Sequence, residues 1–171
     1  MKIKKLALLF ALPLLFSCAK EPLSNDAIDA LIKKYDTEDF SSLKNVYVGY
    51  RGKDETANVM LMVAEFDISC PPYIATVYPE TKELIKTDDH LIKDAEKECK
   101  LYFKKEQIAR YSKAFLKYNF KVLGVDSQGN TYINPTEQEL PNLLRKVPSS
   151  TPKDLKDFKQ YRGNWYVRKA Q

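Results

Sequence analysis

Apolar and polar positions in the middle of the chain follow the short periods of β-strands. NVYVGYR, residues 45–51, alternates in polarity, GKDET is typical of a turn, and NVMLMVAEF, residues 58–66, is a nearly continuous apolar run. These segments predict a hairpin whose second strand lies inside a sheet. Pro71 and Pro72 then interrupt pairing, because proline has no amide hydrogen to donate. YIATVY, residues 73–78, predicts a third strand before the turn PETKE.

Three other segments carry apolar residues at helical spacing. Ser24 is a candidate N-cap for a first helix over 24–35. A second helix is expected over 87–103, with Cys99 inside its buried stripe, and a third over 105–118. The apolar positions of these helices are Ile28, Leu31, Ile32, Tyr35, Leu91, Ile92, Ala95, Cys99, Tyr102, Phe103, Ile108, Tyr111, Phe115 and Tyr118.

The last third of the chain contains the clearest local signal. Two strand-like runs in 121–135 flank DSQGN, whose Gly129 can adopt the positive φ that a short hairpin loop requires. A helix interrupted by a proline is expected over 134–144, a short helix over 153–158, and a final strand over 164–169.

This order of elements predicts an α+β fold. We expect an antiparallel sheet of about four to six strands with helices packed mainly on one face. Residues 26–171 have the length of one ordinary domain, so we expect a single domain there.

The first residues have the pattern of a targeting segment. The charged start MKIKK precedes an apolar run over 6–16, and Cys18 follows directly after Ser17. This run is about half of the roughly 20 residues that a spanning helix needs. Residues 1–17 are therefore predicted to be a signal peptide and residues 18–25 a short polar tether.

Leu15, Ser17 and Cys18 resemble the lipobox of bacterial lipoproteins, although Phe16 stands where a small residue is more usual. The resemblance implies acyl chains on Cys18 that hold the protein on a membrane of the cell envelope, because two or more chains anchor stably. It also favours the outer membrane, since Ala19 is not the aspartate that marks inner-membrane retention. The alternative is ordinary cleavage after Ala19, which would release a secreted soluble protein.

Charge gives little reason to expect a nucleic-acid partner. The chain has 28 basic and 23 acidic residues, but Lys2, Lys4 and Lys5 lie in the predicted signal. The remaining domain would carry a net charge of only +2, which provides no strong field for a polyanion.

Cys70 and Cys99 are the two cysteines of the predicted domain. In an oxidising compartment they are expected to form a disulfide that fixes the 87–103 helix to the sheet edge. The bond would close a loop of about 30 residues and add roughly 3 to 4 kcal/mol of stability. Two separate buried thiols are the alternative.

No set of residues in the sequence indicates catalysis, a metal or a cofactor. His90 is the only histidine, and with Asp94 one helical turn away it supplies at most half of a metal site. Ser127 lacks the flanking glycine of a nucleophile elbow and is expected to be a loop residue. Paired carboxylates of a small envelope hydrolase remain an alternative that spacing alone does not test.

Aromatic residues and arginines gather near the C-terminus and form a candidate binding patch. Such residue types are enriched at binding hot spots, although core or edge packing is the other interpretation. We therefore expect a membrane-anchored protein with a non-catalytic binding or accessory role, such as an inhibitor or immunity-type protein, and a protein or envelope polymer as its partner. The patch residues are Tyr161, Arg162, Trp165, Tyr166 and Arg168.

Overall fold

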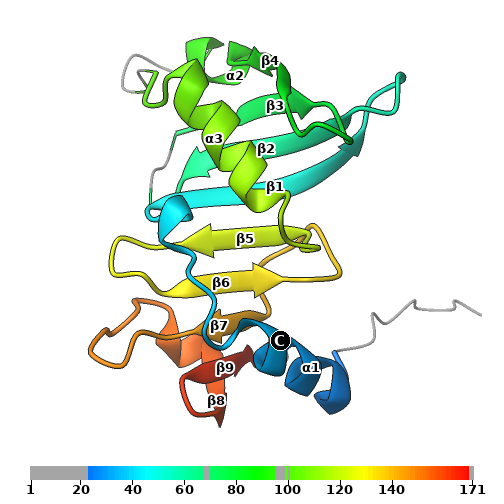
Figure 1. Ribbon diagram of the computed structural model, residues 1–171. Coiled ribbons are helices and arrows are strands. Elements are labelled where there is room, and N and C mark those ends of the chain that lie inside the picture. The colour runs from blue at the N-terminus through cyan, green and yellow to red at the C-terminus, as the bar shows by residue number, and fades with distance from the viewer. Residues whose placement is uncertain (1–22, 68–69, 95–98, 100, 170–171) are drawn as a thin grey trace, which may run out of the picture.

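The computed structural model describes residues 23–67, 70–94, 99 and 101–169. Within this part of the chain, nine strands form one antiparallel sheet in the order β4-β3-β2-β1-β5-β6-β7-β9-β8 (Figure 1). The strands are β1 (Val46–Lys53), β2 (Val59–Glu65), β3 (Tyr73–Val77), β4 (Leu84–Asp88), β5 (Val122–Val125), β6 (Thr131–Asn134), β7 (Leu143–Arg145), β8 (Phe158–Arg162) and β9 (Trp165–Arg168).

The helices lie towards opposite ends of this sheet. They are α1 (Asn25–Tyr35), α2 (His90–Asp94) and α3 (Lys105–Phe115), with short 3-10 turns η1 (Ser41–Leu43) and η2 (Leu155–Asp157). Figure 1 shows α3 crossing the β1–β4 end, α2 beyond β4, and α1 beside the β7–β9 end. Because the helices cover different parts of a twisted sheet, the predicted single layer on one face is not clearly formed.

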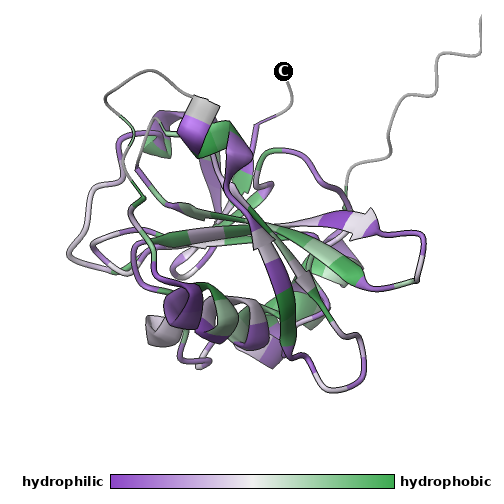
Figure 2. Cartoon of the chain, turned by 90° about the horizontal axis from the view of Figure 1, so that it is seen from above, coloured by the Kyte–Doolittle hydropathy of each residue, from purple (hydrophilic) through white to green (hydrophobic). Residues whose placement is uncertain are grey.

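Most of the core is one hydrophobic cluster. Ile32 of α1 and Phe115 of α3 belong to it, together with alternate strand residues such as Val48, Leu123 and Trp165. Figure 2 shows hydrophobic residues along the strands and hydrophilic residues on the outer loops. This continuity agrees with burial of one apolar face along almost the whole sheet.

A second, smaller cluster covers the opposite face of the C-terminal strands. Tyr132, Leu144 and Phe158 form its buried centre, and Phe66 packs against them. Leu144 therefore belongs to this cluster, whereas the adjacent Leu143 belongs to the main one. β7 is thus covered on both faces, because successive side chains of a strand point to opposite sides.

The β-hairpin predictions are confirmed. β1 pairs with β2, β2 also pairs with β3 and so lies inside the sheet, and β5 pairs with β6. Gly129 in the β5–β6 loop has a φ of 91°, the conformation for which glycine is the best suited residue.

Several predicted elements are wrong. The sheet has nine strands among the described residues, more than the predicted four to six. The 87–103 helix is replaced by β4 and the short α2, and Cys99 lies outside any helix, while 95–98 and 100 fall outside the described residues. The 134–144 helix is the end of β6, a turn and β7, and the 153–158 helix is reduced to η2.

Both edges of the sheet are irregular. The pairing of β3 with β4 shifts between Thr76 and Val77, and that of β8 with β9 shifts between Gln160 and Arg162. Bulges of this kind bend an edge strand and reduce edge-to-edge association. The edges are therefore poor templates for adding another strand.

Candidate functional site

The residues of the predicted C-terminal patch mainly make contacts within the molecule. Trp165 is buried at 2% exposure, and its indole Nε1 donates a hydrogen bond to Asp36 Oδ1 at 2.8 Å. The Tyr161 hydroxyl donates to Asp29 Oδ1 at 3.0 Å, and Arg162 forms an ion pair with the same carboxylate. Trp165 and Tyr161 therefore attach α1 to β8 and β9, and Arg162 adds an exposed ion pair at the same contact.

These contacts lower the pKa of the Asp29 carboxylate. The hydrogen bond from Arg162 is the largest cause, followed by that from Tyr161, and together they hold the pKa of Asp29 below its usual value. The charged form of Asp29 is therefore favoured in the folded protein.

The other two patch residues lie on the opposite face. Arg168 Nε donates to the Pro141 carbonyl at 2.6 Å, and its guanidinium lies 4.4 Å from the centre of the Phe158 ring. Tyr166 packs against the second hydrophobic cluster. The five residues thus do not form one exposed patch, since neighbours along a strand face opposite ways.

A polar hollow of about 390 Å³ opens beside this second cluster, among Asp67, Asp126, Tyr132 and Asp154. Asp126 accepts hydrogen bonds from the backbone of Gln128 and from Asn130 at 2.6–2.9 Å. Its carboxylate therefore shapes the β5–β6 turn.

Tyr132 and Asp154 are also engaged with each other. The Tyr132 hydroxyl donates to Asp154 Oδ1 at 2.9 Å, and burial, followed by this contact, raises the pKa of the phenol. The hollow thus contains three carboxylates, of which Asp126 and Asp154 have structural partners.

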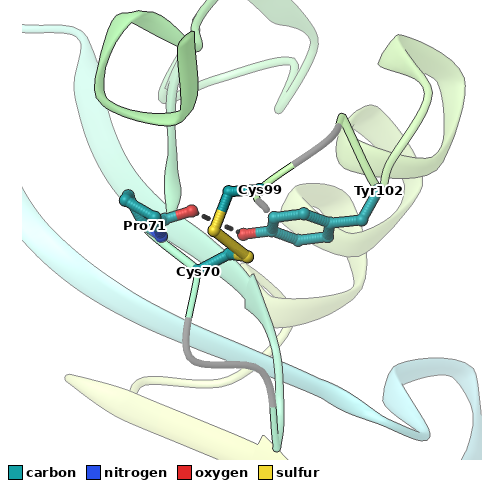
Figure 3. The surroundings of a disulfide bond; sticks show 4 residues. All are labelled: Cys70, Pro71, Cys99 and Tyr102. Atoms are coloured by element: carbon teal, nitrogen blue, oxygen red, sulfur yellow. Dashed lines mark hydrogen bonds between the residues drawn. A yellow bond between two sulfur atoms is a disulfide. The ribbon is translucent and has the colours of Figure 1, made fainter. Parts of the chain in front are cut away.

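The predicted disulfide between Cys70 and Cys99 is confirmed, with Cα atoms 5.6 Å apart. Figure 3 shows Tyr102 beside it, whose hydroxyl donates to the Pro71 carbonyl at 2.8 Å. Because Cys99 is not helical, the bond does not fix a helix as predicted. It joins the segment before α3 to the start of β3.

Aromatic packing reinforces this attachment. Tyr73 contacts Tyr102 with ring centres 4.9 Å apart, and Phe103 contacts Tyr111 of α3 at 5.1 Å. The Tyr73 hydroxyl accepts a hydrogen bond from the Phe103 amide at 3.0 Å. The disulfide and these rings therefore fix the N-terminal end of α3 over the sheet.

A groove of about 580 Å³ lies between the β3–β4 turn and one side of α3, and we call it the β4–α3 groove. Its lining is mainly apolar. We call the half-buried Leu84 and Ala109 its base and the exposed Lys105, Arg110 and Lys113 its rim. The full lining is Lys82, Glu83, Leu84, Lys105, Glu106, Ala109, Arg110 and Lys113.

The groove carries more positive than negative charge. Lys82, Lys105, Arg110 and Lys113 are the basic residues, against two glutamates. Within the described part of the chain, none of these four basic groups forms an ion pair. Arg110 also lies over the Tyr111 ring, 5.2 Å from its centre. The combination of an apolar base with basic groups outside ion pairs makes the groove the candidate functional site.

Sequence reasoning missed this groove. Lys105, Glu106, Ala109, Arg110 and Lys113 follow one another at helical spacing, which by itself is typical of a solvated helix face. The groove forms only where the β3–β4 turn approaches that face, and no local pattern encodes this approach.

The His90 region gives no metal centre among the described residues, where no cluster of three or more potential ligands occurs. His90 Nδ1 contacts Asp88 Oδ1 at 2.6 Å, and the side chain of Asp94 falls outside the description. The hydrogen bond from the His90 amide, followed by that from the ring, lowers the pKa of Asp88.

Length and hydropathy rule out a membrane-crossing helix within the portion of the chain that is described. Comparisons of the chain with protein-family models, curated proteins and solved structures found no match. Functional assignment therefore depends on the residues and their geometry.

Proposed function

We propose that this protein is a lipoprotein of the cell envelope, held on the outer membrane by acyl chains on Cys18, whose domain binds a partner without catalysis. The partner would be a protein or an envelope polymer, as for an inhibitor, an immunity-type protein or an accessory subunit. The single observation behind this proposal is the position of Cys18, which only Ser17 separates from the apolar run and which lies shortly before α1 in the sequence.

The short distance from Cys18 to α1 supports an orientation for the anchored domain. α1 begins at Asn25, so the seven residue steps from Cys18 span at most about 25 Å when fully extended. The α1 end of the sheet would then lie near the membrane. Neighbouring strands are about 4.8 Å apart, so the β4 edge lies roughly 38 Å from the β8 edge, counted along the sheet.

The contacts in the polar hollow support binding over hydrolysis. A carboxylate pair for glycoside hydrolysis needs one acid that can donate a proton and a second that faces it. Asp126 instead accepts three hydrogen bonds from its own turn, and Asp154 accepts one from Tyr132. These contacts assign both carboxylates to structural roles.

Palmitate labelling tests the anchor. Cells that express the full chain are grown with radiolabelled palmitate, and the protein is isolated from the membrane fraction. Wild type is expected to carry label, and Cys18→Ala is expected to lose both the label and membrane retention. The matched control, Cys70→Ser with Cys99→Ser, keeps Cys18 and should remain labelled.

Three outcomes would overturn parts of this proposal. Equal labelling of wild type and Cys18→Ala would reject lipidation, and a wild-type intact mass without acyl chains would favour the secreted soluble protein. For the hydrolase alternative, release of reducing ends from isolated envelope polymer, lost in Asp154→Asn, would replace the non-catalytic role.

A further inference from the structure

The β4–α3 groove combines two chemical properties that together restrict its occupant. Its base is the half-buried Leu84 of β4 and Ala109 of α3, and the aliphatic stems of the lining lysines and arginine add apolar surface. Its rim presents the charged ends of Arg110 and Lys113. An occupant that covers both surfaces needs apolar groups and negative charges close together.

From this complementarity we propose that the β4–α3 groove binds a short acidic segment of a partner protein, with leucine- or phenylalanine-type side chains between its carboxylates. Each carboxylate would pair with a rim cation, while each apolar side chain would cover the base. The position of the groove at the sheet end far from α1 leaves it accessible if Cys18 is anchored.

A peptide fits these observations better than an anionic polymer. A phosphate-rich polymer could neutralise the rim cations, but it would leave the apolar base against water. Burial of apolar area contributes about 25 cal/mol per Å², so an occupant with apolar side chains gains free energy that the polymer does not.

The groove itself is held in a fixed shape. The Cys70–Cys99 bond and the contacts of the Tyr102 and Phe103 rings with Tyr73 attach the start of α3 to β3. Ile108 and Phe115 on the other side of α3 are buried in the main core. A preformed groove lowers the ordering cost of binding, which favours recognition of a flexible peptide.

Fluorescence anisotropy of the full-length protein in detergent micelles tests the proposal. The probe is a labelled synthetic peptide in which glutamate alternates with leucine, and its matched control has glutamine in place of glutamate. We expect the glutamate peptide to bind in the micromolar range or tighter and the control to bind on the order of tenfold more weakly.

Charge-reversal variants locate the site. Arg110→Glu with Lys113→Glu is expected to weaken binding of the glutamate peptide on the order of tenfold or more, and to reduce its salt dependence. Lys53→Glu with Lys159→Glu changes the net charge equally at exposed positions outside the groove and should change affinity less than about threefold. Equal weakening by both pairs would overturn the proposal, as would the absence of binding at about 1 mM peptide.

A groove-filling variant separates peptide from polymer. Ala109→Leu fills the base and is expected to weaken the glutamate–leucine peptide while leaving polyphosphate binding unchanged. Polyphosphate that binds wild type more tightly than the peptide would replace the protein partner by an anionic polymer.

Self-association that Arg110→Glu abolishes would instead assign the groove to a second copy, whose exposed Leu140 follows an acidic stretch.

The outcomes of these binding tests do not depend on whether Cys18 carries a lipid anchor. A non-lipidated chain that still binds the peptide would reject the membrane assignment and keep the groove. A labelled, anchored chain that does not bind it would reject the groove alone.

Discussion

Arg145 of β7 occupies the end of α1 as a cap supplied by a distant part of the chain. Its Nη1 donates to the carbonyl oxygens of Tyr35 and Asp36 at 2.8 and 2.9 Å, and its Nη2 donates to Glu38 O at 2.8 Å. Carbonyls at a helix C-terminus lack intrahelical partners and favour a nearby cation. Burial lowers the pKa of Arg145, but the three carbonyls still receive a charged donor.

Removing this cap should destabilise the protein. Arg145→Ala is expected to lower the free energy of unfolding by about 2 to 4 kcal/mol, because three partly buried carbonyls lose a charged donor. Urea denaturation followed by circular dichroism measures the loss. Arg162→Ala is the matched control, since the Arg162–Asp29 pair is exposed and should contribute little. Equal destabilisation by both substitutions would contradict this role of Arg145.

Local signals predict some elements correctly and mislead at others. The β5–β6 hairpin follows from Gly129 and the apolar runs beside it. The predicted 134–144 helix includes Leu143 and Leu144, but both lie in β7 and face opposite clusters. A short strand buried on both faces has no alternation, so periodicity does not separate it from a helix.

The disulfide also acts between elements, because it attaches an irregular segment to a strand. Reduction is expected to lower the free energy of unfolding by about 3 to 4 kcal/mol, since the Cys70–Cys99 link restricts the unfolded chain over 29 positions. Urea denaturation with and without dithiothreitol measures this. Cys70→Ser with Cys99→Ser should match the reduced wild type and should not respond to reductant. An unchanged wild type would show that the cysteines are not bonded.

At the scale of the whole molecule, one sheet joins two regions with different helices. α3 covers β1–β4, and α1 contacts β7–β9 through Trp165, Tyr161 and Arg145. β1 and β5 pair antiparallel between these regions, and the main hydrophobic cluster includes residues from both. The two ends should therefore unfold together.

Equilibrium unfolding tests this coupling. Trp165 is the only tryptophan and reports on the α1 end, whereas far-UV circular dichroism reports on the whole chain. The two transitions in urea are expected to coincide, as for a single cooperative domain. Comparison with the Val48→Ala variant, which weakens the interior of the sheet, should show both transitions shifted by the same amount. A tryptophan transition at lower urea than the dichroism transition would indicate two separate units.

The sequence by itself determined the antiparallel α+β class, four of the strands in the two hairpins, the third strand, and the first and third helices, because each depends on local periodicity or turn chemistry. It offered Cys70 and Cys99 as a possible pair, and the geometry of the fold decided that they bond. Only the tertiary structure decided the number of strands, the burial of Trp165, the Arg145 cap and the β4–α3 groove. These features depend on contacts between residues far apart in the chain, and local patterns carry no information about which distant segments will meet.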